Sequence, residues 1–238
     1  MNCALCHETK DLCKSHIIPE FIFAPLYDKD HRFIEVTDVA NGVVKRGQKG
    51  YWERLLCVDC EAAISRHERH SRRLFVDPLP PQISGSKRIR EHPRLDYTAF
   101  KLFCLSILWR ASVSSLAIFG HVKLGPHEEV IRQILLTGNA GDTLLYPLQI
   151  YALHFNGDPL RDFLVEPTHM RVDGHLCYRF VFMGFIIFAF VSSHGIPKTA
   201  EKLVIRHDGV IQTFDAELRE FAFLRHVWDT VRETTKDK

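Results

Sequence analysis

The chain has 238 residues, 46% of them hydrophobic, which is enough for a buried core and for one or two domains. Its formal net charge is only +2, so overall charge does not assign it to a class of partner. There are seven cysteines, an odd number, and because Cys3 is almost the first residue we expect no signal peptide. We therefore expect a cytoplasmic protein with thiolate metal ligands, and not a secreted disulfide framework.

Two Cys-x-x-Cys pairs stand out in the first quarter of the chain. Cys3 and Cys6 form one pair, and Cys57 and Cys60 form the other. Each pair offers two thiolates from a tight turn, and four such ligands suit a tetrahedral structural zinc ion. We predict that these four cysteines bind Zn²⁺. The fifty residues between the pairs leave room for a β-hairpin, and the composition from Cys60 onward predicts a helix that starts at the second pair. This order of knuckle, hairpin and helix is that of a treble clef.

A second ligand set is open from spacing alone. It reads Cys-x2-Cys-x6-Cys-x2-His and forms a compact knuckle of Cys3, Cys6, Cys13 and His16. In that arrangement Cys57 and Cys60 would lack partners. His16 would then be a zinc ligand and not a base.

Positive charge is concentrated after the second cysteine pair. Residues 66–94 hold eight Lys and Arg side chains against three Asp and Glu. On the predicted helix Arg66, Arg69 and Arg73 share one face, at spacings of three and four residues. Arginines in such a row can hold phosphates and give salt-dependent binding, so we expect nucleic acid, DNA first, as the partner. A solvated charged helix face is the alternative.

The proline-rich, basic stretch at residues 77–94 has the composition of a linker. We therefore predict a zinc-binding module over residues 1–76 and a larger α+β domain over residues 95–238. In the second domain we expect a buried helix over residues 97–119, because its residues are apolar nearly all round. A second helix is expected over residues 125–138, with Pro126 near its start and Gly138 after its end.

The rest of the second domain is predicted to contain antiparallel hairpins and a closing helix. Asp173-Gly174 and Asp208-Gly209 each lie between strand-like runs, which is a hairpin signal. Residues 180–191 are too short for a membrane-spanning helix and predict two buried strands interrupted by Gly184. The closing helix is expected to begin at a capping Asp215 and to have one apolar face, formed by Leu218, Phe221, Leu224, Val227, Trp228 and Val231.

Residues 1–70 resemble the zinc-stapled HNH, or ββα-metal, endonucleases. The matching pieces are the first cysteine pair, "SHIIP" around His16, and "LLCVDCE" at the second pair. The resemblance implies hydrolysis of DNA phosphodiester bonds, with His16 as general base and a catalytic Mg²⁺ or Mn²⁺ beside the structural zinc. More narrowly, the combination resembles a group of bacterial HNH-like proteins, which implies a role in defence or mobile-element biology.

The resemblance also assigns positions for the catalytic metal. The family usually has Asp or His just before the base, where this chain has Ser15, a poor metal ligand. The family's other ligand position corresponds to Glu61, a hard oxygen donor, and Glu68 lies on the same helix face and is expected to complete the site. Each of these residues also has a purely structural alternative. In it, His16 is a strand residue with hydrogen bonds to the backbone, Glu61 stabilises the start of the helix through its dipole, and Glu68 pairs with an arginine.

Three functions follow from these patterns. The first is a metal-dependent endonuclease whose second domain docks a protein partner, senses a trigger or restrains cleavage. The second is a catalytically inactive treble clef that binds nucleic acid, which the presence of Ser15 favours. The third is a protein-interaction module in which the metal only folds the N-terminal region. None of the three requires a membrane.

Overall fold

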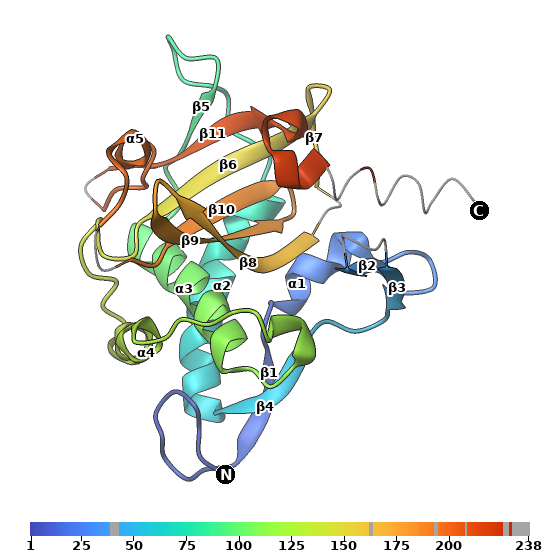
Figure 1. The fold of residues 1–238 in the computed structure, drawn as a ribbon, viewed down its shortest axis with the longest axis vertical. Helices are drawn as coiled ribbons and strands as arrows, with labels where there is room; N and C mark the ends of the chain where they lie inside the picture. Colours follow the sequence, from blue (N-terminus) through green and yellow to red (C-terminus); the bar gives the residue numbers. More distant parts are fainter. Residues whose placement is uncertain (39–42, 162–163, 193–194, 208, 226–228, 230–238) are drawn as a thin grey trace.

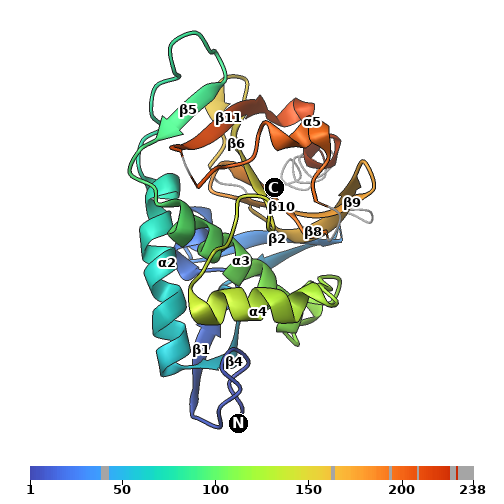
Figure 2. The same cartoon turned by 90° about the vertical axis from the view of Figure 1, so that its left-hand side faces the viewer.

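The computed structural model describes residues 1–38, 43–161, 164–192, 195–207, 209–225 and 229. The N-terminal elements are β1 (Leu12–His16), α1 (Glu20–Phe23), η1 (Ala24–Leu26), β2 (Phe33–Asp38), β3 (Val43–Gly47), β4 (Trp52–Cys57) and α2 (Val58–Val76). Strand β1 pairs antiparallel with β4, while β2 and β3 pair with each other between them in sequence. Helix α2 follows β4 directly and runs up to the large sheet (Figure 2).

Helix α2 begins and ends where local chemistry requires. Cys57 is extended and caps the helix, and Asp59 and Glu61 lie in the first turn, where the helix dipole favours carboxylates. The helix ends at Val76 because Asp77 precedes a proline, and a residue before proline avoids the α conformation. Asp77 is accordingly extended. The predicted helix starting at the second cysteine pair is confirmed.

The remaining elements form a large sheet and the helices against it. They are β5 (Ile89–His92), α3 (Tyr97–Val113), η2 (Ala117–Phe119), α4 (His127–Thr137), β6 (Leu148–Phe155), β7 (Asp158–Pro159), β8 (Leu164–Val172), β9 (His175–Phe182), β10 (Phe185–Phe190), α5 (Lys198–Glu201), β11 (Ile211–Glu217) and η3 (Leu218–Glu220). The strand order is β5-β11-β6-β10-β9-β8, with β7 beside β6 (Figure 1). The chain is thus a mixed α and β structure. Among the described residues, no helix is long and apolar enough to cross a membrane.

The two faces of the large sheet are covered differently. Helices α2 and α3 pack below one face (Figure 2), where Phe75 contacts Phe103 and Phe185 with ring centroids 5.8 and 5.6 Å apart. The opposite face carries a second apolar cluster, in which Phe221 and Leu224 from the C-terminal segment pack over the strands. Helix α3 therefore lies in the centre of the molecule, and its buried residues surround the helix, as its sequence predicts.

Several predicted elements are confirmed. The second helix is α4, and Gly138 after it adopts the left-handed conformation of a C-terminal cap. Strands β8 and β9 flank Asp173 and Gly174, both with positive φ, as an Asp-Gly hairpin turn requires. The apolar run at residues 180–191 forms parts of β9 and the whole of β10, which turn at Gly184.

The second predicted hairpin is wrong. No strand is present in residues 202–207, and β11 pairs instead with β5 on one side and, in parallel, with β6 on the other. Asp208 of the expected turn lies outside the described residues. Asp215 is also not a helix cap, because it lies within β11 and its carboxylate accepts hydrogen bonds of 2.7 and 2.8 Å from Arg90. Residues 222–225 are helical, and Val227, Trp228 and Val231 lie outside the described residues.

The segment at residues 77–94 contributes structure of its own. Its β5 forms the edge of the large sheet, and one apolar core runs from Ile64 and Phe75 through Phe103 to Phe185 without a break at this segment. The division into residues 1–76, 77–94 and 95–238 stays a prediction about separate folding units.

Candidate metal centre and the polar site beside it

The four predicted cysteine ligands meet at one end of α2. The sulfur atoms of Cys3, Cys6, Cys57 and Cys60 all lie within 4.8 Å of one another, and those of Cys6 and Cys57 are 3.9 Å apart. Zn–S bonds of about 2.3 Å place the sulfurs of a tetrahedral site about 3.8 Å apart, so the cluster fits one such ion. Within the described residues, no other group of three or more His, Cys, Asp or Glu side chains meets in this way.

Backbone geometry around the first pair explains how the cluster forms. The loop closes through hydrogen bonds from the Cys3 amide to the Glu8 carbonyl and from the His7 amide to the Cys3 carbonyl. The Ala4 amide donates to Leu55 of β4, which fixes this loop beside the second pair. The Cys57 amide also donates to the Cys3 sulfur at 3.3 Å. Backbone donors aimed at a sulfur are the usual support for a metal-bound thiolate.

The surroundings of the thiols differ within the cluster. Burial acts to raise the pKa of Cys3, but amides of Cys6, Cys57 and Leu5 outweigh it and lower this pKa to about 7. Burial and the neighbouring sulfurs raise the pKa of Cys60. Four thiols in contact cannot all ionise without a cation between them, and a divalent metal supplies the charge that does this.

The rival ligand set does not assemble among the described residues. The Cys13 sulfur donates to the carbonyl of Leu56 at 3.1 Å instead of facing Cys3 and Cys6. The imidazole of His16 lies beside Glu20, with 3.3 Å between Nε2 and Oε2. The geometry therefore favours the two Cys-x-x-Cys pairs as the metal ligands.

His16 occupies the last position of β1, opposite Trp52 of β4. A quarter of its side chain is exposed. Burial, with Lys14 adding to it, lowers the pKa of His16, so its imidazole is neutral at pH 7 and keeps a lone pair. Glu20, the nearby carboxylate, also accepts a hydrogen bond from Tyr27 at 2.8 Å. Sequence reasoning missed Glu20, although its place four residues after His16 was a usable signal.

Glu61 lies in the first turn of α2, next to Ser15. Burial raises the pKa of Glu61, and the Ser15 hydroxyl opposes this rise. Its buried Oε2 makes no hydrogen bond to any described residue. Ser15 is itself fully buried and accepts a hydrogen bond from the Leu56 amide at 3.2 Å. An unpartnered buried carboxylate oxygen is costly, which makes Glu61 the most notable polar group of this region.

Glu68 is held by a fully buried arginine from α3. Arg110 donates from Nη2 to the Glu68 carboxylate at 2.7 Å and from Nη1 to the backbone carbonyl of His16. Arg110 is 0% exposed and the Glu68 side chain 17%, so this ion pair is largely shielded from solvent. We expected Glu68 to complete a metal site, but its carboxylate is engaged by Arg110 instead. Among the described residues, the ligand atoms of His16, Glu61 and Glu68 do not gather as a group. Nothing local in the sequence points to Arg110, which is 94 residues from His16.

The three arginines predicted to bind phosphate, Arg66, Arg69 and Arg73, are exposed along α2 and form no ion pair with a described residue. The helix turns by about 100° per residue, so the row of these arginines is centred about 120° round the helix axis from the line of Glu61 and Glu68. Arg72 lies closer to that line, where its guanidinium packs over the ring of Phe21 at 5.7 Å. Sequence reasoning did not select Arg72, although its spacing of eleven residues from Glu61 places it on the same face.

Comparison with known proteins adds no relative. No family model, no curated protein and no solved structure matches the chain.

Proposed function

We propose that the protein is an endonuclease that hydrolyses phosphodiester bonds in nucleic acid, most simply DNA, with His16 as the general base. One observation carries the proposal: a partly exposed imidazole at the end of β1, opposite the start of β4, lies beside a carboxylate. A neutral imidazole at such a position suits proton removal from an attacking water. The arginine-rich helix that follows suits a polyanionic substrate.

The roles of the individual side chains follow from their contacts. The Glu20 carboxylate orients the imidazole of His16 and stabilises it once it has taken a proton. Arg110 fixes the backbone of His16 through its carbonyl and therefore acts as a positioning residue. The structural zinc ion of the proposal is held by the two cysteine pairs, which join the start of the chain to the start of α2.

A catalytic divalent ion fits this site only in part. Glu61 offers one free carboxylate oxygen, whereas Glu68 is engaged by Arg110 and Ser15 accepts from the backbone. Mg²⁺ is often bound through one or two carboxylates together with substrate phosphates and water, so one carboxylate is compatible with it. When bound, such an ion supplies positive charge at the phosphate and the leaving oxygen.

Cleavage of supercoiled plasmid in Mg²⁺ or Mn²⁺ tests the proposal. Zinc-loaded wild-type protein is expected to nick the plasmid, and His16→Ala is expected to keep its zinc but lose the activity. His169→Ala is the matched control, because His169 is an exposed histidine on β8. The proposal fails if no offered DNA or RNA is cut, or if His16→Ala cuts as well as wild type.

A catalytically inactive nucleic-acid-binding or protein-interaction module is the second candidate. It is favoured by the ion pair of Glu68 with Arg110 and by Ser15 at the usual ligand position, because both reduce the oxygens available to an ion. In the binding version, affinity for DNA falls with salt, and each of Arg66→Ala, Arg69→Ala and Arg73→Ala lowers the slope of log K against log salt by about one. Arg171→Ala on β8 is the control. Unchanged affinity in all three variants would leave only the protein-interaction version.

A further inference from the structure

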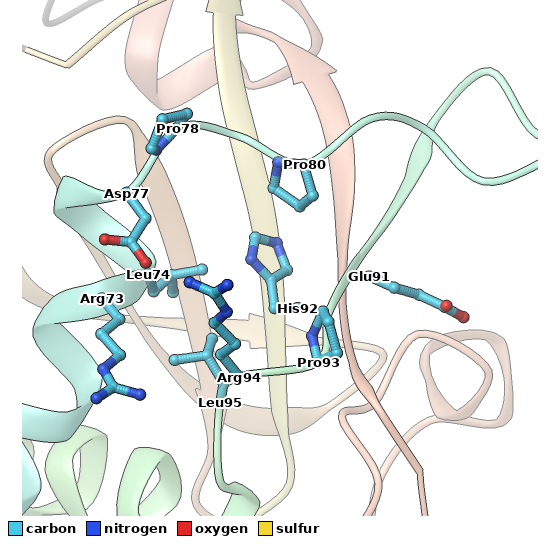
Figure 3. A pocket seen from close by; sticks show the side chains of 10 residues that line it. All are labelled: Arg73, Leu74, Asp77, Pro78, Pro80, Glu91, His92, Pro93, Arg94 and Leu95. Carbon is cyan, nitrogen blue, oxygen red and sulfur yellow. The ribbon is translucent and has the colours of Figure 1, made fainter.

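A pocket of about 400 Å³ lies at the far end of α2 from the cysteines. The last turn of α2, the proline-rich stretch after it and the end of β5 enclose it (Figure 3). Its volume is within the range of small-molecule sites, which span about 300–1,000 Å³. Round the helix axis, Asp77 is about 160° from Glu61, so the pocket is separate from the polar site around His16.

One part of the pocket wall is apolar and held in place. Pro78 and Pro80 form one wall, and Leu74 and Leu95 lie below them (Figure 3). The Pro80 carbonyl accepts a hydrogen bond of 2.5 Å from Arg90, which is itself paired with Asp215 of β11. Rigid proline rings with a fixed backbone make a preformed surface that loses little entropy when a flat ligand packs against it.

Two opposite charges face the pocket without pairing with each other. The guanidinium of Arg94 extends between the Asp77 carboxylate and the imidazole of His92 (Figure 3). Neither Arg94 nor Asp77 forms an ion pair with a described residue, and the Asp77 carboxylate accepts no hydrogen bond among them. The His92 ring is held by Thr213 at 3.0 Å, and burial lowers the pKa of His92 to about 4, so the ring is neutral. The pocket thus offers separate donors and acceptors above an apolar floor.

These features match a guanine base. Guanine presents O6 and N7 as adjacent acceptors, which a guanidinium binds in a bidentate way. Its neighbouring edge has two N–H donors, which a carboxylate accepts, and its flat ring packs on apolar side chains as unstacked bases do in protein pockets. Adenine has an amino donor where guanine has O6, so it would place this donor against Arg94.

An amino acid would also suit a pocket with one arginine and one aspartate. A second cation in the pocket favours a nucleotide over an amino acid. Arg73 stands at the edge of the pocket, with its guanidinium on the side away from Pro78 and Pro80 (Figure 3). The single carboxylate of an amino acid is satisfied by Arg94 and leaves Arg73 without a role. The phosphate of a nucleotide reaches it, because the base and the phosphate lie at opposite ends of the ligand.

We propose that this pocket binds a guanine nucleotide, with Asp77 and Arg94 reading the base edges, Pro78 and Pro80 packing on the ring, and Arg73 contacting the phosphate. The same chemistry is offered by a free nucleotide and by a guanosine unit within a nucleic-acid strand that lies along the arginine row. The proposal concerns binding alone and does not depend on cleavage by the site around His16.

Isothermal titration calorimetry of the full zinc-loaded chain with GMP, AMP, CMP and UMP tests the proposal. GMP is expected to bind at least about tenfold more tightly than AMP, the discrimination typical of one good bidentate pair. Asp77→Asn is expected to remove most of this preference, and Arg73→Ala to weaken GMP while leaving guanosine unchanged. Glu91→Gln is the matched control, because the Glu91 carboxylate points away from the pocket centre (Figure 3) and accepts from Gln212.

Further titrations distinguish a free nucleotide from a guanosine unit in a nucleic-acid strand, and they show which results overturn the proposal. Binding of free GMP identifies a nucleotide site, whereas binding only of short oligonucleotides that contain guanosine, lost in Asp77→Asn, identifies a strand site. Equal affinity for all four bases, unaltered preference in Asp77→Asn, or binding of an amino acid without any nucleotide overturns the proposal. Circular dichroism of each variant shows whether it is folded, and Arg94→Lys, which keeps the charge but not the fork, provides a milder second test.

Discussion

The region before residue 77 and the region after residue 94 share one apolar core but differ in what else stabilises them. The second region is built around α3, whose buried side chains lie on all sides of the helix, and around the strands β6, β9 and β10. The first region has small sheets of two strands, and a cluster of four cysteines joins its start to the start of α2. Short two-stranded sheets are marginally stable alone, so the first region needs support from elsewhere.

Part of that support comes from the second region itself. Arg110 of α3 donates to the carbonyl of His16, and Arg132 of α4 donates to the carbonyl of Leu5 in the first cysteine loop. Both arginines are buried. Two buried cations from the apolar region thus satisfy backbone carbonyls of the metal-binding region. The comparison teaches that the first region adds to the shared apolar core buried arginines from α3 and α4 and a cysteine cluster that could hold a metal, whereas the sheet rests on apolar packing.

Removal of the metal is expected to give the largest effect and to separate the two regions. Binding of structural zinc contributes apparent free energies of about 10–16 kcal/mol in small zinc-binding peptides, far more than one side-chain contact. Chelation, or Cys60→Ala, should therefore expose the amides of β1 and β4 to hydrogen exchange while those of β6, β9 and β10 stay protected. Hydrogen exchange with mass spectrometry measures both regions at once.

Cys13→Ala is the control for the metal experiment. The Cys13 sulfur bonds to a backbone carbonyl outside the cluster, so this variant is expected to keep one zinc ion per chain. If it loses zinc, the compact knuckle that includes Cys13 and His16 is the ligand set. If chelation exposes the sheet as much as β1 and β4, the two regions form one cooperative unit and the comparison is wrong.

Breaking the buried ion pair is expected to have the next largest effect. Arg110→Met removes the cation but leaves the Glu68 carboxylate and the His16 carbonyl in the interior, which costs about 3–5 kcal/mol of unfolding free energy. The double variant Arg110→Met, Glu68→Met is expected to recover much of this loss, because it leaves no buried charge. Urea unfolding of the two single variants, the double variant and wild type measures the coupling. Equal losses in Arg110→Met and in the double variant would contradict it.

The sequence predicted the elements that local chemistry determines. The cysteine pairs, the start of α2, the helices α3 and α4 and the turns at Asp173-Gly174 and Gly184 each depend on residues that are neighbours in the chain. The Asp-Gly signal at residues 208–209 failed because a turn sequence does not determine which strand β11 meets. Its partners are β5 and β6, more than fifty residues away.

The candidate site was predictable to the same extent. The cysteine cluster follows from spacing, and the pairing of β1 with β4 ahead of α2 brings Ser15, the neighbour of His16, to Glu61 in the first turn of α2. The engagement of Glu68 by Arg110 was not predictable, because an arginine within an apolar helix has no periodicity that names its partner. The pocket at Asp77 and Arg94 was hidden for a related reason: residues 77–94 have the composition of a linker, although β5 joins the large sheet.

A pH-dependent effect is expected at the junction between the two regions. The pKa of His92 is lowered by burial to about 4, against about 6.5 in the unfolded chain. The unfolded chain therefore binds more protons between these values. The unfolding free energy is therefore not reduced by this histidine above about pH 6.5. It falls by about 2–3 kcal/mol as the pH decreases towards 4.

His92→Gln removes this titration and allows it to be measured. Zinc ligands also take up protons in acid, but they do so equally in both proteins, so the difference in unfolding free energy between wild type and His92→Gln isolates the histidine. Between pH 7 and pH 4, wild type is expected to lose more unfolding free energy than His92→Gln. A constant difference over that range would show that His92 is not shielded from solvent by β5 and β11.

The smallest expected effect is a local one in the apolar region. Gly174 has a φ of +85°, and a Cβ added there meets nothing within 4 Å, so only backbone strain opposes a side chain. Gly174→Ala is expected to cost about 1 kcal/mol, while Gly174→Asn costs less because asparagine tolerates the left-handed conformation. Hydrogen exchange should rise only at the ends of β8 and β9, since the β8–β9 turn is supported by its own strands. Altered zinc content or altered exchange in α2 would show instead that the two regions respond together even to a small change, and the sheet could then no longer be treated as stabilised independently of the metal centre.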